Sequence, residues 1–128
     1  TGCAGDKDML LLAELNQPQT LQTLVDTIAC NLQRTPQVIG DLNKPIKHIA
    51  LCTGAEQGYI EQAVAAGVDA YICGEISEQT VHVARESGIS YISAGHHATE
   101  RYGIQALGEH LAQQFDFEHE FIDIDNPV

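Results

Sequence analysis

A threefold repeat of strand, glycine and helix most limits the fold that this chain can adopt. In each unit an apolar run of strand length ends near a glycine and leads into a segment with helical spacing. The runs IKHIALCTG (46–54), VDAYICGE (68–75) and ISYISAG (89–95) begin the three units. Because strands separated by helices of about a dozen residues pair in parallel through right-handed crossovers, the repeat predicts an α/β fold. We expect a mainly parallel sheet with helices on both faces, in three layers.

The helical segments carry their own start and stop signals. YIEQAVAAG (59–67) has apolar residues three and four apart and closes on a glycine, whereas SEQTVHVARESG (77–88) opens with Ser77 as a cap and ends at Gly88. The third helix is longer, and its apolar side consists of Ile104, Leu107, Leu111 and Phe115. The closing segment HEFIDID (119–125) predicts a last strand.

The first 45 residues are interpreted as a smaller strand-helix-strand unit that leads into the repeating part. DMLLLAEL (8–15) fits a strand or a helix, PQTLQTLVDTIACNLQR (18–34) fits an amphipathic helix, and TPQVIGD (35–41) fits a short strand. The prolines that separate these pieces are Pro18, Pro36 and Pro45. We predict two units, 1–45 and 46–128, within one compact domain, because 128 residues suffice for one core.

Charge and composition exclude several classes of partner. The chain has 18 acidic residues against 6 Lys and Arg, so no basic stripe can follow a phosphate backbone and nucleic acid is not expected as a partner. No run approaches the roughly 18 to 20 apolar residues of a membrane span, and the amino end lacks the order of a signal peptide. We therefore expect no membrane partner and a cytoplasmic location. The four cysteines form no C-x-x-C pair, and we expect four buried, reduced thiols.

The carboxyl ends of the repeated strands are the places where chemistry is expected, because ligands of open parallel sheets collect there. These ends are Thr53-Gly54, Gly74-Glu75 and Gly95-His96, and the last two carry ionisable side chains. The turn CTGAEQG has neither a G-x-G-x-x-G nor a G-K-[ST] pattern, so it is interpreted as an ordinary turn.

The segment AGHHATERYG (94–103) combines two histidines and a glutamate at a helix start. If the helix begins near His97, then His96 and Glu100 lie on one face, and imidazole with carboxylate suits zinc, iron, manganese or cobalt. The helix dipole also favours a carboxylate in the first turn without any metal, so spacing alone leaves both interpretations open. Two ligands do not close a site. The candidates that could complete it are Glu75, Glu78 and His82, although His82 also fits a packed helix histidine.

Several of these motifs together carry a family resemblance. They are the glycine-rich turn after the first strand, the V-D-A-Y-I-C-G-E segment, the G-H-x-x-T-E motif at 95–100 and the closing FIDIDNP. The sequence resembles the carboxyl-terminal half of the Nif-three-like family, whose members bear the label GTP cyclohydrolase I type two homologue. The resemblance runs from about Lys47 to Pro127 and extends more faintly back to Leu15.

The resemblance implies a centre of two divalent metal ions, with zinc, iron or manganese as the first candidates, to which His96 and Glu100 contribute. Under this mapping His97 is not a ligand and lies beside the ligands or faces the substrate. The remaining ligands, a histidine pair and an aspartate, come from an amino-terminal half that these 128 residues do not contain. Many relatives have lysine and histidine after the glycine-acid pair of the middle strand, but this chain reads Ile76 to Gln79 there, so no catalytic residue is assigned.

Two functions of different classes follow. The first is a metal-dependent hydrolase in which paired cations activate water, acting on GTP or another nucleotide or small molecule. The second is a non-catalytic metal-binding scaffold that forms a homo-oligomer, for which the resemblance implies a ring-like hexamer. Taken alone, the 128 residues are expected to bind cations weakly or not at all, because incomplete coordination gives low affinity.

Overall fold

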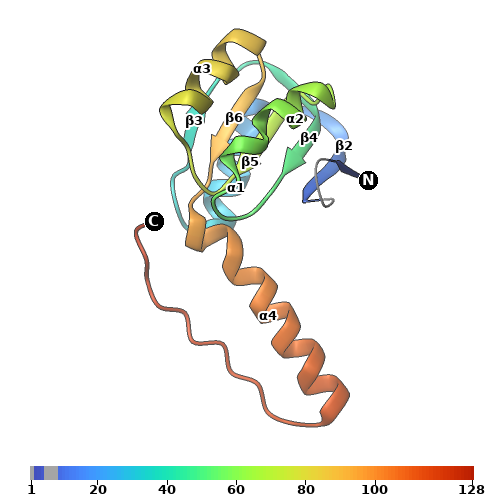
Figure 1. The fold of residues 1–128 in the computed structure, drawn as a ribbon. Coiled ribbons are helices and arrows are strands. Elements are labelled where there is room, and N and C mark those ends of the chain that lie inside the picture. Colours follow the sequence, from blue (N-terminus) through green and yellow to red (C-terminus); the bar gives the residue numbers. More distant parts are fainter. Residues whose placement is uncertain (1, 5–8) are drawn as a thin grey trace.

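One mixed sheet organises the chain, whose residues 2–4 and 9–128 are described by the computed structural model in Figure 1. In the described residues the strand order is β1-β2-β4-β5-β6-β3. The strands are β1 (Gly2–Ala4), β2 (Leu10–Thr20), β3 (Gln37–Ile39), β4 (Pro45–Leu51), β5 (Ala70–Cys73) and β6 (Ser90–Ser93). The prediction of an α/β fold is confirmed.

The direction of the strands corrects the prediction of a mainly parallel sheet. Only the repeating part pairs in parallel, β4 with β5 and β5 with β6. The strands from the first 45 residues pair in antiparallel, because β1 and β2 extend the sheet beyond β4 while β3 pairs with β6. Of the segment 8–15, residue 8 lies outside the described residues, and the rest belongs to β2 except Met9. Strands of both predicted units share this sheet, and the boundary at residue 45 stays a prediction.

Alternating side chains of the central strands form two apolar clusters on opposite sides of the sheet. Ala50, Tyr71 and Tyr91 pack with residues of α2 (Ile60–Ala65) and α3 (Glu78–Ser87). Their strand neighbours Ile49, Ala70 and Ile92 pack against α1 (Leu21–Leu32). Since successive side chains of a strand point to opposite faces, helices cover both faces of the central strands. A 3-10 turn, η2 (Gln57–Tyr59), precedes α2.

Local capping signals set the bounds of α3 as the sequence predicted. Ser77 is the N-cap, and its hydroxyl accepts a hydrogen bond from the Thr80 backbone N–H in a capping box. Gly88 ends the helix with φ 73°, a left-handed conformation that glycine adopts without a Cβ penalty. Helix α1 starts later than predicted, at Leu21, because β2 continues through Pro18 to Thr20, whose side chain caps the helix.

The last helix, α4 (His96–Phe115), projects away from the sheet, and the tail runs back beside it (Figure 1). Ala98 is its one buried residue, and the predicted apolar side is largely exposed, with Ile104 at 57% and Phe115 at 69%. The predicted strand at 119–125 is wrong, since the chain has no regular structure after α4. The side of β6 that faces away from β5 is already paired with β3, so the tail cannot add a strand to β6. Among the described helices, none combines the length and hydropathy of a membrane span.

The cysteines divide into two pairs. Cys52 and Cys73 are buried at the ends of β4 and β5, whereas Cys3 and Cys30 are exposed, which corrects the expectation of four buried thiols. All four are free. Burial raises the pKa of the Cys52 thiol, and the neighbouring Cys73 and Glu56 raise it further.

Candidate functional site

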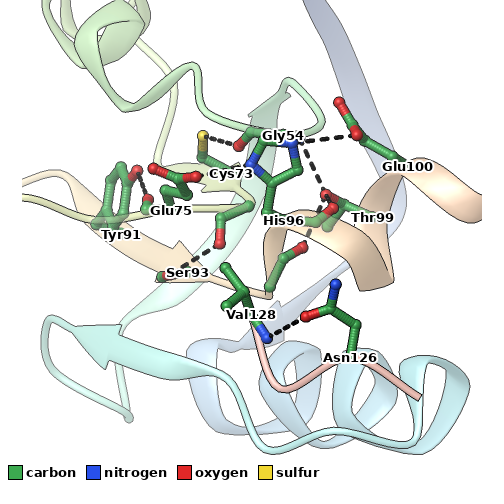
Figure 2. A network of polar contacts seen from close by, with 12 residues as sticks. Gly54, Cys73, Glu75, Tyr91, Ser93, His96, Thr99, Glu100, Asn126 and Val128 are labelled. Atoms are coloured by element: carbon green, nitrogen blue, oxygen red, sulfur yellow. Dashed lines mark hydrogen bonds and ion pairs between the residues drawn. The ribbon is translucent and has the colours of Figure 1, made fainter. Parts of the chain in front are cut away.

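The three predicted strand ends meet at one edge of the sheet. Beyond the strands, the Gly74 backbone N–H donates to Gly54 O at 3.1 Å, and the Gly95 N–H donates to Gly74 O at 2.9 Å. Three glycine backbones therefore lie side by side, and Glu75 and His96, which follow the second and third glycine, lie within 2.7 Å of each other. Figure 2 shows how Gly54, Glu75, His96 and Glu100 gather there.

The His96 ring lies between two carboxylates at this edge. Its Nε2 atom is 3.1 Å from Glu100 Oε2, one helical turn further along α4. Its Nδ1 atom is 2.7 Å from Glu75 Oε1, which comes from the end of β5. The side chains of His96 and Glu75 are about one-third exposed and that of Glu100 about one-half. His96 and Glu100 thus converge, and their binding of a metal stays a prediction.

The two carboxylates set the electrostatics of the ring. The hydrogen bond with Glu75 raises the pKa of His96 above its ordinary value, and the negative charges of Glu100 and Glu75 act in the same direction against the opposing effect of burial. In the absence of a cation the ring therefore holds a proton more readily than an exposed histidine does. A cation at Nε2 would take the place of that proton.

Two glycines allow the loops to approach the site closely. Gly54 has φ +69°, and a Cβ atom built there would collide with the Glu100 carboxylate and lie 3.3 Å from His96 Nε2. At Gly74 a Cβ atom would come within 2.9 Å of His96 Cα. Any side chain at either position would push the loop away from α4, so the site depends on both glycines.

Thr99 holds the loop after β4 against α4, a role that was not predicted from the sequence. Its hydroxyl accepts a hydrogen bond from the Gly54 N–H at 3.1 Å and lies 2.9 Å from Gly95 O, to which it donates. Its position inside the G-H-x-x-T-E motif was the signal that could have indicated this. The motif thus combines the two candidate ligands with the residue that fixes the neighbouring loop.

Of the three candidates that could complete the ligand set, Glu75 lies beside His96 Nδ1, whereas Glu78 and His82 do not join His96 and Glu100. Glu78 and His82 lie on α3, exposed, with His82 Nε2 4.0 Å from Glu78 Oε1. His82 is therefore not a packed histidine either, since its side chain is 63% exposed. Within residues 2–4 and 9–128, no group of three or more His, Cys, Asp or Glu side chains is arranged to hold a metal ion. The described part of the chain thus offers a partial ligand set.

His97 faces a different region, beside the carboxyl-terminal tail. Its Nε2 atom is 3.6 Å from Asp123 Oδ1, and its ring lines a cavity of about 340 Å³. The tail is attached here at three further points: Arg101 Nη1 is 3.1 Å from Asp123 Oδ2, Arg34 donates to Pro127 O at 2.7 Å, and the His97 N–H donates to Val128 O at 3.1 Å. The tail thus fixes the first turn of α4, from which His96 and Glu100 project.

A comparison with protein families matches residues 4–127 to the model of Duf34/NIF3 (NGG1p interacting factor 3). Among curated proteins, the GTP cyclohydrolase 1 type 2 homolog of Pseudomonas aeruginosa is 54% identical over 122 residues, which are 95% of this chain and 48% of that protein. The protein of the same name from Haemophilus influenzae is 50% identical over 126 residues, 97% of this chain and 50% of that protein. The chain therefore spans about half the length of these relatives.

Solved structures show the same fold. The protein ybgI, described as being of unknown function, superposes with a TM-score of 0.91 at 44% identity, over 95% of this chain and 50% of that chain. TTHA1606 from Thermus thermophilus gives a TM-score of 0.78 at 26% identity, over 88% of this chain and 45% of that chain.

Proposed function

Because the chain belongs to the DUF34/NIF3 family, we propose that it supplies His96 and Glu100 to the metal centre of a metal-dependent hydrolase. The proposed hydrolase is of the kind that the name of the relatives indicates, GTP cyclohydrolase 1 type 2 homolog. We propose that its centre holds two divalent ions. The convergence of His96 Nε2 and Glu100 Oε2 at 3.1 Å carries this proposal. Zinc, iron and manganese all accept a histidine nitrogen with a carboxylate oxygen.

The donor set fits a divalent ion on the Nε2 side of His96. Glu75 Oε1 lies 2.7 Å from Nδ1 and accepts its proton in the tautomer that carries one there, which leaves the Nε2 lone pair on the side where Glu100 lies. When bound, paired cations supply an activated water and polarise the bond to be cleaved. His96 and Glu100 would hold the cation, while Gly54 and Gly74 allow the loops to lie close to α4.

The acidic character of the chain limits how it could bind the phosphates of a nucleotide substrate such as GTP. With 6 Lys and Arg against 18 acidic residues, this chain offers few cations to a nucleotide. If GTP is the substrate, its phosphates are held mainly by the metal ions. Residues of the other half, which the relatives contain and this chain does not span, would supply the remaining contacts. A cytoplasmic location also stays a prediction.

Metal titration of the 128-residue chain tests the ligand assignment. We expect weak Zn²⁺ binding that His96→Ala and Glu100→Gln both abolish, because each removes one of two converging donors. His82→Ala is the matched control, since it removes an exposed histidine of α3 and should leave binding unchanged. Equal binding by all four proteins would contradict the assignment.

The catalytic part needs the longer polypeptide that carries the other half found in relatives. Loaded with zinc, iron or manganese, it should hydrolyse GTP or simple phosphate esters, and His96→Ala should remove that activity. Failure to turn over any of these with full metal occupancy would exclude the hydrolase and leave the second candidate.

The exposed apolar surface of α4 and the tail favours that second candidate, a metal-binding scaffold that forms a homo-oligomer. The side chains concerned are Ile104, Leu107, Phe115, Phe117, Ile122 and Ile124, each at least half exposed. Apolar surface of this kind marks interaction sites. Sedimentation of Leu107→Ser beside the matched control Gln113→Ser tests it, and loss of self-association should be confined to Leu107→Ser. Assembly that survives in a catalytically silent protein would support the scaffold.

A further inference from the structure

Two tyrosines form a matched pair in the centre of the sheet. Tyr71 of β5 and Tyr91 of β6 are register partners, both fully buried, with ring centroids 5.4 Å apart and planes at 78°. Edge-to-face packing of this kind stabilises the pair through the ring quadrupoles. Burial raises the pKa of both hydroxyls above their ordinary value, and the nearby Cys73 raises it further. Both hydroxyls therefore remain hydrogen-bond donors.

The two hydroxyls hold different loops. Tyr71 Oη donates to Glu56 O at 2.6 Å, in the loop after β4. Tyr91 Oη donates to Glu75 O, also at 2.6 Å, in the loop after β5 (Figure 2). Glu75 is the residue whose carboxylate lies 2.7 Å from His96 Nδ1. One tyrosine thus acts on the backbone of a residue that contacts His96, while the other acts on a residue for which the structure gives no such contact.

The backbone of Glu75 must be held in place for its carboxylate to reach from the loop after β5 to His96 of α4. The preceding residue is held, since the Gly74 N–H donates to Gly54 O and Gly74 O accepts from Gly95. The following helix begins only after the cap at Ser77. Between these points the Tyr91 hydrogen bond fixes the direction of the Glu75 peptide, and hence the position from which its side chain reaches the ring.

We propose that Tyr91 is a positioning residue for His96, acting through Glu75; the inference rests on the proposed function only for its consequence in metal binding. With Glu75 in place, the neutral ring carries its proton on Nδ1 and presents the Nε2 lone pair beside Glu100. Without that anchor the carboxylate moves away, and the ring populates the tautomer with the proton on Nε2, which cannot bind a cation there.

The test compares Tyr91→Phe with Tyr71→Phe in the 128-residue chain. Both remove one buried hydroxyl that donates at 2.6 Å, so both should lose similar stability toward urea. Nitrogen-15 chemical shifts of the His96 ring, recorded without metal at a pH where the ring is neutral, report the tautomer. We expect Tyr91→Phe to shift the population toward Nε2–H and Tyr71→Phe to leave it unchanged. Glu75→Gln serves as the reference for a disturbed Nδ1 contact.

Zn²⁺ titration gives a second measurement. Loss of a group that orients a metal-bound histidine lowers affinity about 10- to 100-fold, and for Tyr91→Phe, one contact further away, we expect roughly 3- to 10-fold. If the longer polypeptide binds no Zn²⁺, the proposed function fails, while the tautomer comparison in the 128-residue chain still decides the role of Tyr91. Equal changes of the His96 nitrogen-15 chemical shifts in the two Phe variants, or no change in either, would overturn the proposed role of Tyr91. Should Tyr91→Phe not fold, replacement of Tyr91 by 4-fluorophenylalanine fills the hydroxyl space without a donor and gives the same decision.

Discussion

The backbone N–H of Gly54 donates a hydrogen bond to Thr99 Oγ1 at 3.1 Å, across 45 residues of sequence. This contact joins the loop after β4 to the first turn of α4. Since Glu100 follows Thr99 and packs against Gly54, the same bond controls how closely the Glu100 carboxylate approaches the loop. The candidate site is therefore held by its own motif.

Substitution of Thr99 tests this bond. Thr99→Val keeps the shape but removes the acceptor, so we expect the free energy of unfolding to fall by about 1 kcal/mol. Thr99→Ser keeps the hydroxyl and should retain most of the stability. Urea unfolding followed by circular dichroism measures both. A loss in Thr99→Ser without a loss in Thr99→Val would mean that the methyl group, and not the hydrogen bond, is responsible.

A second substitution tests the close approach at Gly54. Gly54→Ala places a Cβ against the Glu100 carboxylate and forces an alanine into φ +69°, so we expect a loss of about 1–3 kcal/mol in thermal unfolding. Gly58→Ala is the matched control, because a Cβ there meets no atom within 4 Å. It should be neutral or slightly stabilising. Comparable losses at the two glycines would show that contact with Glu100 is not the cause.

The parts of this fold that could be predicted are those fixed by local signals. Ser77 and Gly88 bound α3, and the spacing of four residues brought His96 and Glu100 together on one helix. Strand direction in the first 45 residues could not be predicted, because it is decided by pairing with distant strands. The tail has a strand-like pattern, yet it contacts the start of α4. Glu75 is 21 residues from His96, so its contact with Nδ1 needed the sheet to be known.

The raised pKa of His96 predicts how the site responds to pH. Hydrogen bonding to Glu75 is the first cause, so Glu75→Gln should lower the pKa of His96 toward 6.5. A raised pKa means that the protonated ring stabilises the fold below the unfolded pKa, and that this contribution is lost as pH rises through the folded pKa. Cation affinity changes in the opposite sense, falling as pH drops through the folded pKa. Proton NMR titration of His96 measures the shift, with Glu78→Gln as a control that should leave it unchanged.

The lowered pKa of Asp69 predicts a second dependence on pH, which affects the free energy of unfolding and not cation binding. Its Oδ2 accepts the backbone N–H groups of Lys47 at 2.9 Å and His48 at 2.8 Å, which tie the start of β5 to β4. Although burial raises the pKa of Asp69, the hydrogen bonds from these two N–H groups lower it below its usual range on balance.

Asp69→Ala should therefore destabilise the chain by about 1–2 kcal/mol at pH 7, since two N–H donors lose a charged acceptor. A lowered folded pKa means that this stability is fully present above the unfolded pKa, near 3.9, and is lost as pH falls through the folded pKa. The difference from wild type should thus be present at pH 7 and shrink below about pH 4. Urea unfolding at each pH measures it. Glu109→Ala removes one exposed negative charge of α4 and controls for net charge. A difference that persists undiminished at pH 3 would show that Asp69 acts through packing and not through its charged form.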